Sequence, residues 1–221
     1  MVKRAFDLTF ALLGSALLAP ISLIIWLAVK LDDGGPVFYR QTRVGWRGQP
    51  FEIIKFRTMR TGADRIGPGI TASGDPRITR VGRWLRKAKL DELPQLWNVL
   101  RGTMSLVGPR PELPQYVAHY SPEQRRVLEL RPGITDEASI QFRDEEALLA
   151  AAANPEEFYL EYCLPRKIEL NLAHAEQAGL LGDLRVLFRT IGAVWLRDPV
   201  GGAGVSAVRG RGSADHPPEA L

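Results

Sequence analysis

The chain has 221 residues, 45% of them hydrophobic, and a formal net charge of +4, which suits one medium-sized domain plus an appendage. Its one cysteine, Cys163, excludes an internal disulfide and makes a reducing, cytosol-facing location the default expectation. Its three histidines are scattered and match no zinc spacing, so we expect any metal to be held by oxygen ligands, as magnesium is.

The run from Leu8 to Val29 contains 22 residues without a charge. As an α-helix it would reach about 33 Å, enough to cross the hydrocarbon core of a bilayer. The run is too long for the apolar region of a signal peptide, and Ala19-Pro20-Ile21 is a poor cleavage site. The alternative is a helix buried in a soluble core. Because the run has no polar face, we favour membrane insertion.

Pro20 lies in the middle of this run, and both flanks are basic. Lys3 and Arg4 precede the run, and Lys30 begins a still more basic segment after it. The positive-inside rule asks both flanks to stay in the cytoplasm, which one straight span does not allow. A mid-helix proline bends the axis. We therefore predict a re-entrant membrane helix over residues 1–31, with Pro20 as its break.

Beyond Asp32 the pattern predicts a small β-hairpin and then a basic helix. Val37–Arg40 and Phe51–Phe56 are typical of strands around a turn at Trp46–Gln49, with the basic residues on one side. A glycine-rich loop over residues 60–75 follows. The helix is expected over residues 76–89, with four apolar side chains inward: Ile78, Val81, Trp84 and Leu85.

The stretch from Leu90 to Pro111 combines carboxylates with a rigidly presented arginine. Asp91 is predicted as the N-cap of a short helix that has Glu92 in its first turn and stops at Gly102. Two prolines then flank Arg110 and fix its backbone. Carboxylates, a guanidinium and helix-start N–H groups are used to handle phosphate, usually with a divalent metal. The alternative is purely structural, with Asp91 capping and Arg110 pairing with a carboxylate.

The second half of the chain is expected to be largely helical. A capping box begins at Ser121, and further helices are predicted over residues 144–153 and from Asn154. Residues 183–197 form an amphipathic pattern, for which packing on the core and an in-plane position at a membrane interface both stay open. From Pro199 the composition is typical of disorder.

Four segments in order carry a resemblance: KRAFDLTFALLGSALLAPISLIIWLAVK, GGPVFYRQTRVGWRGQPFEIIKFRTM, DPRITRVGRWLRKAKLDELPQLWNVLRGTMSLVGPRPE and RPGIT. From Lys3 to about Arg197 the sequence resembles the bacterial sugar transferases, monotopic polyprenyl-phosphate phosphoglycosyl transferases that start membrane glycan assembly. The fold this implies is an α/β, mostly helical, membrane-associated domain with a re-entrant helix, a small hairpin and interfacial amphipathic helices. We expect a catalytic domain over residues 32–198 and a disordered tail over residues 199–221.

The resemblance also implies a reaction. A sugar-1-phosphate passes from a UDP-sugar to a polyprenyl phosphate such as undecaprenyl phosphate, and UMP is released. Asp91 would be the nucleophile that forms an aspartyl-phosphosugar, and Mg²⁺ would bind at Asp91 and Glu92. Family arginines are matched near the phosphates by Arg86 and Arg110, and near the nucleotide by Arg143 and Arg131.

The chain departs from the family after RPGIT, where a glycine is common and this sequence has Asp136 and Glu137. Aspartate tolerates positive φ less well than glycine and adds charge near the donor site. The departure leaves the chemistry intact but puts sugar identity and the role of Arg143 in question.

The resemblance further implies the cytoplasmic face of the bacterial inner membrane as the location, with membrane lipids and no nucleic acid as partners. The competing hypothesis is a membrane-anchored basic module that binds acidic lipid or nucleic acid without catalysis, supported by the arginine content. The intact Asp-Glu pair argues against an inactive scaffold. A homodimer stays open, because an exposed apolar face suits a second copy as well as a membrane.

Overall fold

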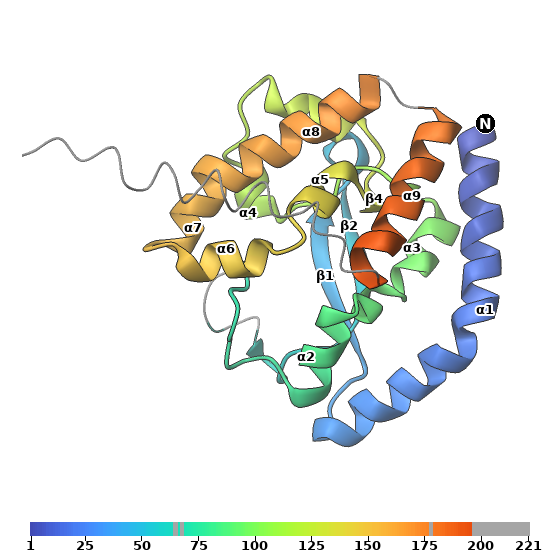
Figure 1. Ribbon diagram of the computed structural model, residues 1–221, viewed down its shortest axis with the longest axis vertical. Coiled ribbons are helices and arrows are strands. Elements are labelled where there is room, and N and C mark those ends of the chain that lie inside the picture. The colour runs from blue at the N-terminus through green and yellow to red at the C-terminus, as the bar shows by residue number, and fades with distance from the viewer. Residues whose placement is uncertain (64–65, 67–68, 177–178, 196–221) are drawn as a thin grey trace, which may run out of the picture.

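The computed structural model describes residues 1–63, 66, 69–176 and 179–195, with the backbone alone for 194 and 195. The described residues are mostly helical with one small antiparallel hairpin, as predicted (Figure 1). The tail predicted from residue 199 lies outside them. The elements in chain order are α1 (Val2–Asp33), β1 (Phe38–Val44), η1 (Trp46–Gly48), β2 (Pro50–Phe56), α2 (Arg80–Lys87), η3 (Leu90–Glu92), α3 (Gln95–Arg101), β3 (Ser105–Val107), α4 (Pro114–Val117), η4 (Gln124–Glu129), β4 (Gly133–Thr135), α5 (Glu137–Gln141), α6 (Glu145–Ala151), α7 (Pro155–Phe158), η5 (Tyr159–Cys163), α8 (Leu164–Glu176) and α9 (Leu180–Trp195).

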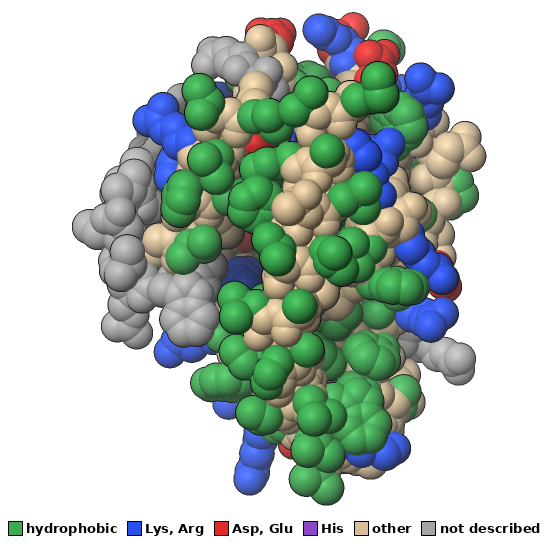
Figure 2. Space-filling model, turned by 90° about the vertical axis from the view of Figure 1, so that its right-hand side faces the viewer, with side chains coloured by type: hydrophobic (Ala, Val, Ile, Leu, Met, Phe, Trp, Pro, Cys, Tyr) green, Lys and Arg blue, Asp and Glu red, His purple; other side chains and the backbone are tan. Residues whose placement is uncertain are grey.

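Helix α1 runs along one side of the molecule, bends along its length and contains Pro20 (Figure 1). By length and composition it could cross a membrane. Figure 2 shows hydrophobic side chains gathered over the face that α1 forms. We call this the apolar face, and its exposed large residues on α1 are Val2, Leu8, Phe10, Leu12, Leu13, Leu17, Ile21, Leu23, Ile24, Trp26, Leu27 and Leu31.

Both ends of α1 are fastened to the rest of the domain. Near its start, Arg4 donates to the carbonyls of Val99 (2.6 Å) and Leu100 (2.9 Å) at the end of α3. One turn later, the buried Asp7 accepts from the Ser105 hydroxyl (2.9 Å) and the Leu106 N–H (3.1 Å).

At the other end of the helix, Asp33 forms an ion pair with Arg57 just after β2. Gly34 then ends α1 in the left-handed conformation, with φ of 72°. The two ends of this helix therefore meet the same body of protein.

The predicted hairpin is present as β1 and β2, paired antiparallel from Phe38 opposite Phe56 to Val44 opposite Pro50. The prediction that its basic residues share one side is wrong. Side chains alternate between faces along a strand. The side chains of Arg43 and Lys55 are each 16% exposed, whereas that of Arg40 is 64% exposed.

Asn98 of α3 binds the backbone of β2 through its side chain. Its side-chain amide donates to the Glu52 carbonyl (2.7 Å), and its oxygen accepts from the Ile54 N–H (3.2 Å). Because an asparagine amide can satisfy a backbone donor and a backbone acceptor together, it extends the ladder of β2 by one side chain. The helix that follows the Asp-Glu pair is thereby fixed to the strand that carries Lys55.

The segments VGPRP and RPGIT lie side by side through the short parallel pair β3 and β4. A Cβ on Gly108 would lie 2.3 Å from the Arg131 carbonyl oxygen, and one on Gly133 would lie 2.2 Å from the Gly108 nitrogen. Only glycine permits backbones to approach this closely. The crossing therefore brings residues around Arg110 next to those that follow Thr135.

Helix α2 is shorter than the predicted 76–89, since it begins at Arg80 and ends at Lys87, and one of its side chains also differs from the prediction. Thr79 caps its N-terminus by accepting from the Gly82 N–H (2.9 Å), and Leu85 is buried as expected. Trp84, expected inward, is 60% exposed. The buried residues of this eight-residue helix are Gly82 and Leu85, which are three positions apart and share one face, and Trp84 lies off that face.

In the C-terminal half, the predicted capping box is confirmed, although it begins the 3₁₀-helix η4. The Ser121 N–H donates to the Gln124 side chain (2.9 Å), and the Gln124 N–H donates to the Ser121 hydroxyl (3.2 Å). On α9, Val186 is buried in the core while Phe188 and Ile191 are exposed. Helix α9 therefore packs on the core and also exposes apolar side chains.

Candidate active site

The Asp-Glu pair, Asp91 and Glu92, which we call the dyad, occupies one tight turn ahead of α3. Lys89 adopts the left-handed conformation, with φ of 54°, and η3 follows as a single 3₁₀ turn that contains Asp91 and Glu92. The prediction that Asp91 is an N-cap is wrong, because α3 begins only at Gln95 and Pro94 occupies its N-cap position. The predicted stop at Gly102 is confirmed, with φ of 85°. Asp91 is therefore free for another role.

Glu92 is enclosed by two cations. Arg110 donates from Nη1 to Oε2 (3.0 Å) and from Nη2 to Oε1, so that the pair is bidentate. Lys55 donates from Nζ to Oε1 (3.1 Å). Burial opposes ionisation of Glu92, but Arg110 and Lys55 outweigh it and hold the pKa of this carboxyl well below its ordinary value. Glu92 is thus an ionised carboxylate that both cations engage.

Asp91 lies in the opposite situation. It is 7% exposed, and its Oδ1 is buried without a hydrogen-bond partner in the part of the chain that the structure describes. Burial and the negative charge of Glu92 raise the pKa of Asp91, while Lys55, Arg86 and Lys89 act against them. Buried polar atoms are normally paired, so an unpaired oxygen beside these cationic residues indicates a place for a reacting or coordinating group.

Lys55 belongs to this site, although the sequence reasoning treated it only as part of a basic flank. Burial lowers its pKa to about 8, and Glu92 acts in the opposite direction. The signal that could have found it is strand parity. Tyr39, Gln41 and Arg43 of β1 share with Lys55 the face of the hairpin that lies toward the dyad.

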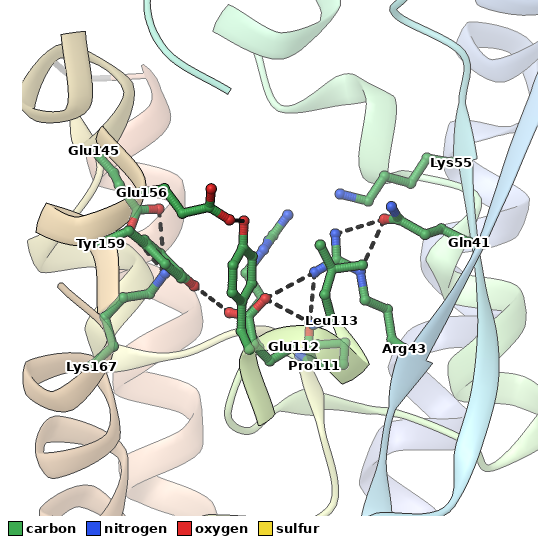
Figure 3. A network of polar contacts seen from close by, with 12 residues as sticks. Gln41, Arg43, Lys55, Pro111, Glu112, Leu113, Glu145, Glu156, Tyr159 and Lys167 are labelled. Atoms are coloured by element: carbon green, nitrogen blue, oxygen red, sulfur yellow. Dashed lines mark hydrogen bonds and ion pairs between the residues drawn. The ribbon is translucent and has the colours of Figure 1, made fainter. Parts of the chain in front are cut away.

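A buried polar network backs the loop that carries Arg110 (Figure 3). Glu112 lies at its centre, between Arg43 of β1 and Tyr159 of η5 (Figure 3). Arg43 donates to Glu112 (3.3 Å) and to the Gln41 side chain (2.6 Å), and Tyr159 donates to the second Glu112 oxygen. The network therefore joins β1 of the hairpin to η5 through Glu112, close to the loop that carries Arg110.

The sequence pattern of the bacterial sugar transferase family matches residues 1–197. A UDP-glucose:undecaprenyl-phosphate glucose-1-phosphate transferase of Caulobacter vibrioides is 40% identical over 201 residues, which cover 89% of this chain and 70% of that protein. An undecaprenyl-phosphate glucose phosphotransferase of Komagataeibacter xylinus is 40% identical over 196 residues, covering 86% of this chain and 35% of its own length. This chain belongs to the bacterial sugar transferases. The transferase is accordingly an enzyme, as predicted.

A third relative, a UDP-glucose:undecaprenyl-phosphate glucose-1-phosphate transferase of Escherichia coli, is 42% identical over 199 residues. The match covers 86% of the transferase and 39% of the E. coli protein. The transferase therefore spans little more than a third of two of these relatives and most of the first.

Of the four arginines predicted to bind substrate, only Arg110 contacts the dyad directly. Arg86 lies near enough to lower the pKa of Asp91, and it donates to Glu146 (2.5 Å) while its buried Nε stays unpaired among the described residues. Arg131 donates to the Gly102 carbonyl at the end of α3, and its Cζ lies 4.8 Å from the centroid of the Trp46 ring. These contacts give Arg131 a structural role, and its substrate role stays a prediction.

Arg143 is likewise engaged by protein. It donates to the Ala193 carbonyl near the end of α9 (3.0 Å) and to Asp144 (3.4 Å). The structure does not bring Arg143 into hydrogen-bond contact with either dyad carboxylate in the described part of the chain, and its nucleotide role also stays a prediction.

The dyad offers few oxygen ligands to the magnesium ion that the resemblance implies, but these few fit such an ion. The unpaired Oδ1 of Asp91 is a hard oxygen donor. Glu92 already accepts three hydrogen bonds of the roughly four that a carboxylate can take. No group of three or more metal-ligating side chains occurs among the described residues. Magnesium commonly binds through one or two carboxylates plus phosphates and water, which matches this inventory.

Lys55 provides a pH test of the site. Its pKa of about 8 means that the amine loses its proton as the pH rises through that value, after which it no longer complements Glu92 and an incoming phosphate. We expect kcat/KM for sugar transfer to fall above about pH 8. Lys55→Arg, whose guanidinium stays charged, should move this decline to higher pH. The exposed Lys87→Arg is the matched control and should keep the wild-type profile. An unchanged alkaline decline in Lys55→Arg would assign it to another group.

Proposed function

We propose that the transferase moves a sugar-1-phosphate from a UDP-sugar to undecaprenyl phosphate, releases UMP and so starts assembly of a membrane glycan. The names of the relatives from Caulobacter vibrioides and Escherichia coli support the class of donor and acceptor. The observation that carries the proposal is the asymmetry of the dyad. Glu92 is paired with Arg110 and Lys55, whereas Asp91 keeps a buried oxygen without a partner among the described residues.

In the first step of this proposal, an Asp91 oxygen attacks the phosphorus that bears the sugar. A bond forms from that oxygen to phosphorus, the bond from phosphorus to the bridging oxygen breaks, and UMP leaves with the electron pair. The pKa of Asp91 is raised by burial and by Glu92, which makes its carboxylate a stronger nucleophile than an ordinary one. Attack by the ionised carboxylate requires no proton transfer.

In the second step, a phosphate oxygen of the lipid attacks the same phosphorus, and the Asp91 carboxylate leaves. Lys55 and Arg110 supply positive charge beside both transition states. Magnesium, held by Asp91 with the remaining capacity of Glu92, would neutralise diphosphate charge. One site thus serves a soluble donor and a membrane acceptor in turn.

The proposed acceptor requires the site to lie at a membrane surface. Arg4 and Asp7 fasten the start of α1 to the domain, and Asp33 fastens its end. A helix whose two ends meet one folded body has them on one side of a bilayer. This supports the re-entrant path, with Pro20 deepest and the catalytic body on the cytoplasmic face. Further apolar contacts for the interface are the exposed Phe188 and Ile191 of α9 and Trp97 of α3.

The competing proposal, a basic module that binds lipid or nucleic acid without turnover, has less support. Exposed cations such as Arg40 suit a binding surface, but Lys55 and Arg43 are mostly buried and complement carboxylates inside the protein. Incubating the protein with UDP-sugar and undecaprenyl phosphate and measuring UMP separates the two. Release of UMP supports the transferase, and salt-sensitive binding without UMP supports the module.

Asp91→Asn is expected to abolish turnover while the protein stays folded, because an amide is not a competent nucleophile. Wild-type protein given donor alone should release UMP and gain the mass of one phosphosugar, and the variant should do neither. Glu169→Gln, which removes a solvent-exposed carboxylate that pairs with Arg166, is the matched control and should keep turnover. A wild-type rate in Asp91→Asn would remove Asp91 from the nucleophile role.

Arg110→Lys is expected to lower kcat/KM by roughly 10²–10³-fold, the scale seen when one preorganised donor to a transition state is lost. Lysine keeps the charge but cannot form the bidentate contact that Arg110 makes with Glu92. The measurement is steady-state UMP release together with thermal unfolding in detergent. Near-normal kinetics at unchanged stability would make Arg110 a spectator.

The re-entrant path is tested by labelling. In a background with Cys163 replaced, Val2→Cys should resist an impermeant thiol reagent in intact cells and react once the membrane is opened. Glu123→Cys, on the exposed surface of the catalytic body, is the matched control and should behave identically. Labelling of Val2→Cys in intact cells, with Glu123→Cys protected, would show a spanning helix.

A further inference from the structure

We infer that Asp136 is a positioning residue for Arg110: its carboxylate fixes the backbone of the Pro109-Arg110-Pro111 loop and so sets where the guanidinium lies. The inference rests on the proposed function. It assigns a role to a buried carboxylate that the proposed reaction does not use. Asp136 would act through Arg110, without touching either substrate.

The loop has one backbone donor with which it can be held. Pro109 and Pro111 have no N–H, so Arg110 supplies the only one among these three residues. That N–H donates to Oδ2 of Asp136 at 3.0 Å. The neighbouring carbonyls are held separately, that of Pro109 by the Gly133 N–H (3.0 Å) and that of Pro111 by Arg43 (3.3 Å).

Asp136 is built into this position. It is 1% exposed, and its φ of −155° is ordinary extended backbone, so the aspartate causes none of the strain that a positive φ would bring. Oδ1 accepts from the Ser139 N–H (2.5 Å) as the N-cap of α5. Oδ2 accepts from Asn171 of α8 (2.9 Å) in addition to Arg110. A buried carboxylate is stable only when such donors compensate it.

These contacts leave no role for Asp136 as a ligand of metal or substrate. Both oxygens are engaged by three N–H donors, and the side chain is closed off from solvent. They do connect α8 to the dyad. Asn171 holds Asp136, Asp136 holds the backbone of Arg110, and the Arg110 side chain holds Glu92 through two contacts.

The two prolines give this connection its effect. Their rings fix φ at Pro109 and Pro111, so few backbone torsions around Arg110 can absorb a shift. A shift at the Arg110 nitrogen is therefore passed to the guanidinium. Misplacement of a catalytic group by about 1 Å can cost on the order of 10²-fold in rate.

The test substitution is Asp136→Asn, which keeps the shape of the side chain. One oxygen becomes an NH₂ group, so three N–H donors face a single acceptor, and the new NH₂ opposes either the Ser139 N–H or the N–H donors of both Arg110 and Asn171. We expect kcat/KM for the UDP-sugar to fall by on the order of 10–100-fold, the range typical for partners that orient a site residue. Glu137→Gln is the matched control, because Glu137 is the adjacent carboxylate and pairs with Arg189 instead. It should stay within about threefold of wild type.

A double-mutant cycle with Arg110→Lys separates positioning from a merely structural role. If Asp136 acts through the Arg110 guanidinium, Asp136→Asn should change kcat/KM by less than about twofold once that guanidinium is gone. A structural role would reduce activity by the same factor in both backgrounds. Should Asp136→Asn fail to fold, Asn171→Ala is used in the same cycle. It removes one donor to Asp136 and leaves Arg110 bonded, and a smaller loss is expected, again confined to the background that keeps Arg110.

The outcomes are distinguishable from failure of the proposed function. Wild-type protein that releases no UMP from a UDP-sugar would overturn the proposed function itself. With active wild-type protein, kinetics of Asp136→Asn like those of Glu137→Gln would overturn the positioning role. Equal losses in the wild-type and Arg110→Lys backgrounds of the cycle would do the same.

Discussion

The contact between Glu92 and Arg110 is the interaction on which the rest of the site depends. It is bidentate, partly buried and supplemented by Lys55, so Glu92 stays ionised within the protein. Breaking such a pair would leave an uncompensated buried charge, which is strongly unfavourable. Because Glu92 takes up these cations, its neighbour Asp91 is left with an oxygen that no described residue pairs. Two adjacent carboxylates of similar chemistry thus lie in different environments, decided by what surrounds each.

The close crossing of two backbone segments helps to fix the geometry of the contact between Glu92 and Arg110. Gly108 and Gly133 let two segments that are distant in the sequence approach closer than any side chain would allow. Prolines on both sides of Arg110 then limit how its backbone can move, and the Glu112 network supports the loop from behind (Figure 3). Rigidity around Arg110 is the physical requirement, since a preorganised guanidinium needs no reorganisation when charge develops.

The long apolar helix, which by length and composition could cross a membrane, is also packed into the body that carries the dyad. Arg4 engages the carbonyl end of α3, the helix that follows the dyad, and Asp7 is buried against β3. The same helix exposes its other sides as the apolar face (Figure 2). Under the proposed function, one element would therefore couple membrane contact to the assembly of the site, and a shift of α1 would displace α3.

The sequence by itself determined the elements whose signals are local. The uncharged run with Pro20, the strands of the hairpin, the capping box at Ser121 and the stop at Gly102 follow from neighbouring residues. The Asp-Glu pair and the proline-flanked arginine could also be recognised, because their chemistry lies within one stretch. Only the tertiary structure decided which groups meet. Lys55 joins the dyad through strand parity and the contact of Asn98 with β2, and Arg131 turns to the end of α3. Asp136 is held by donors from three segments, and such convergence of distant residues leaves no local pattern that a sequence could display.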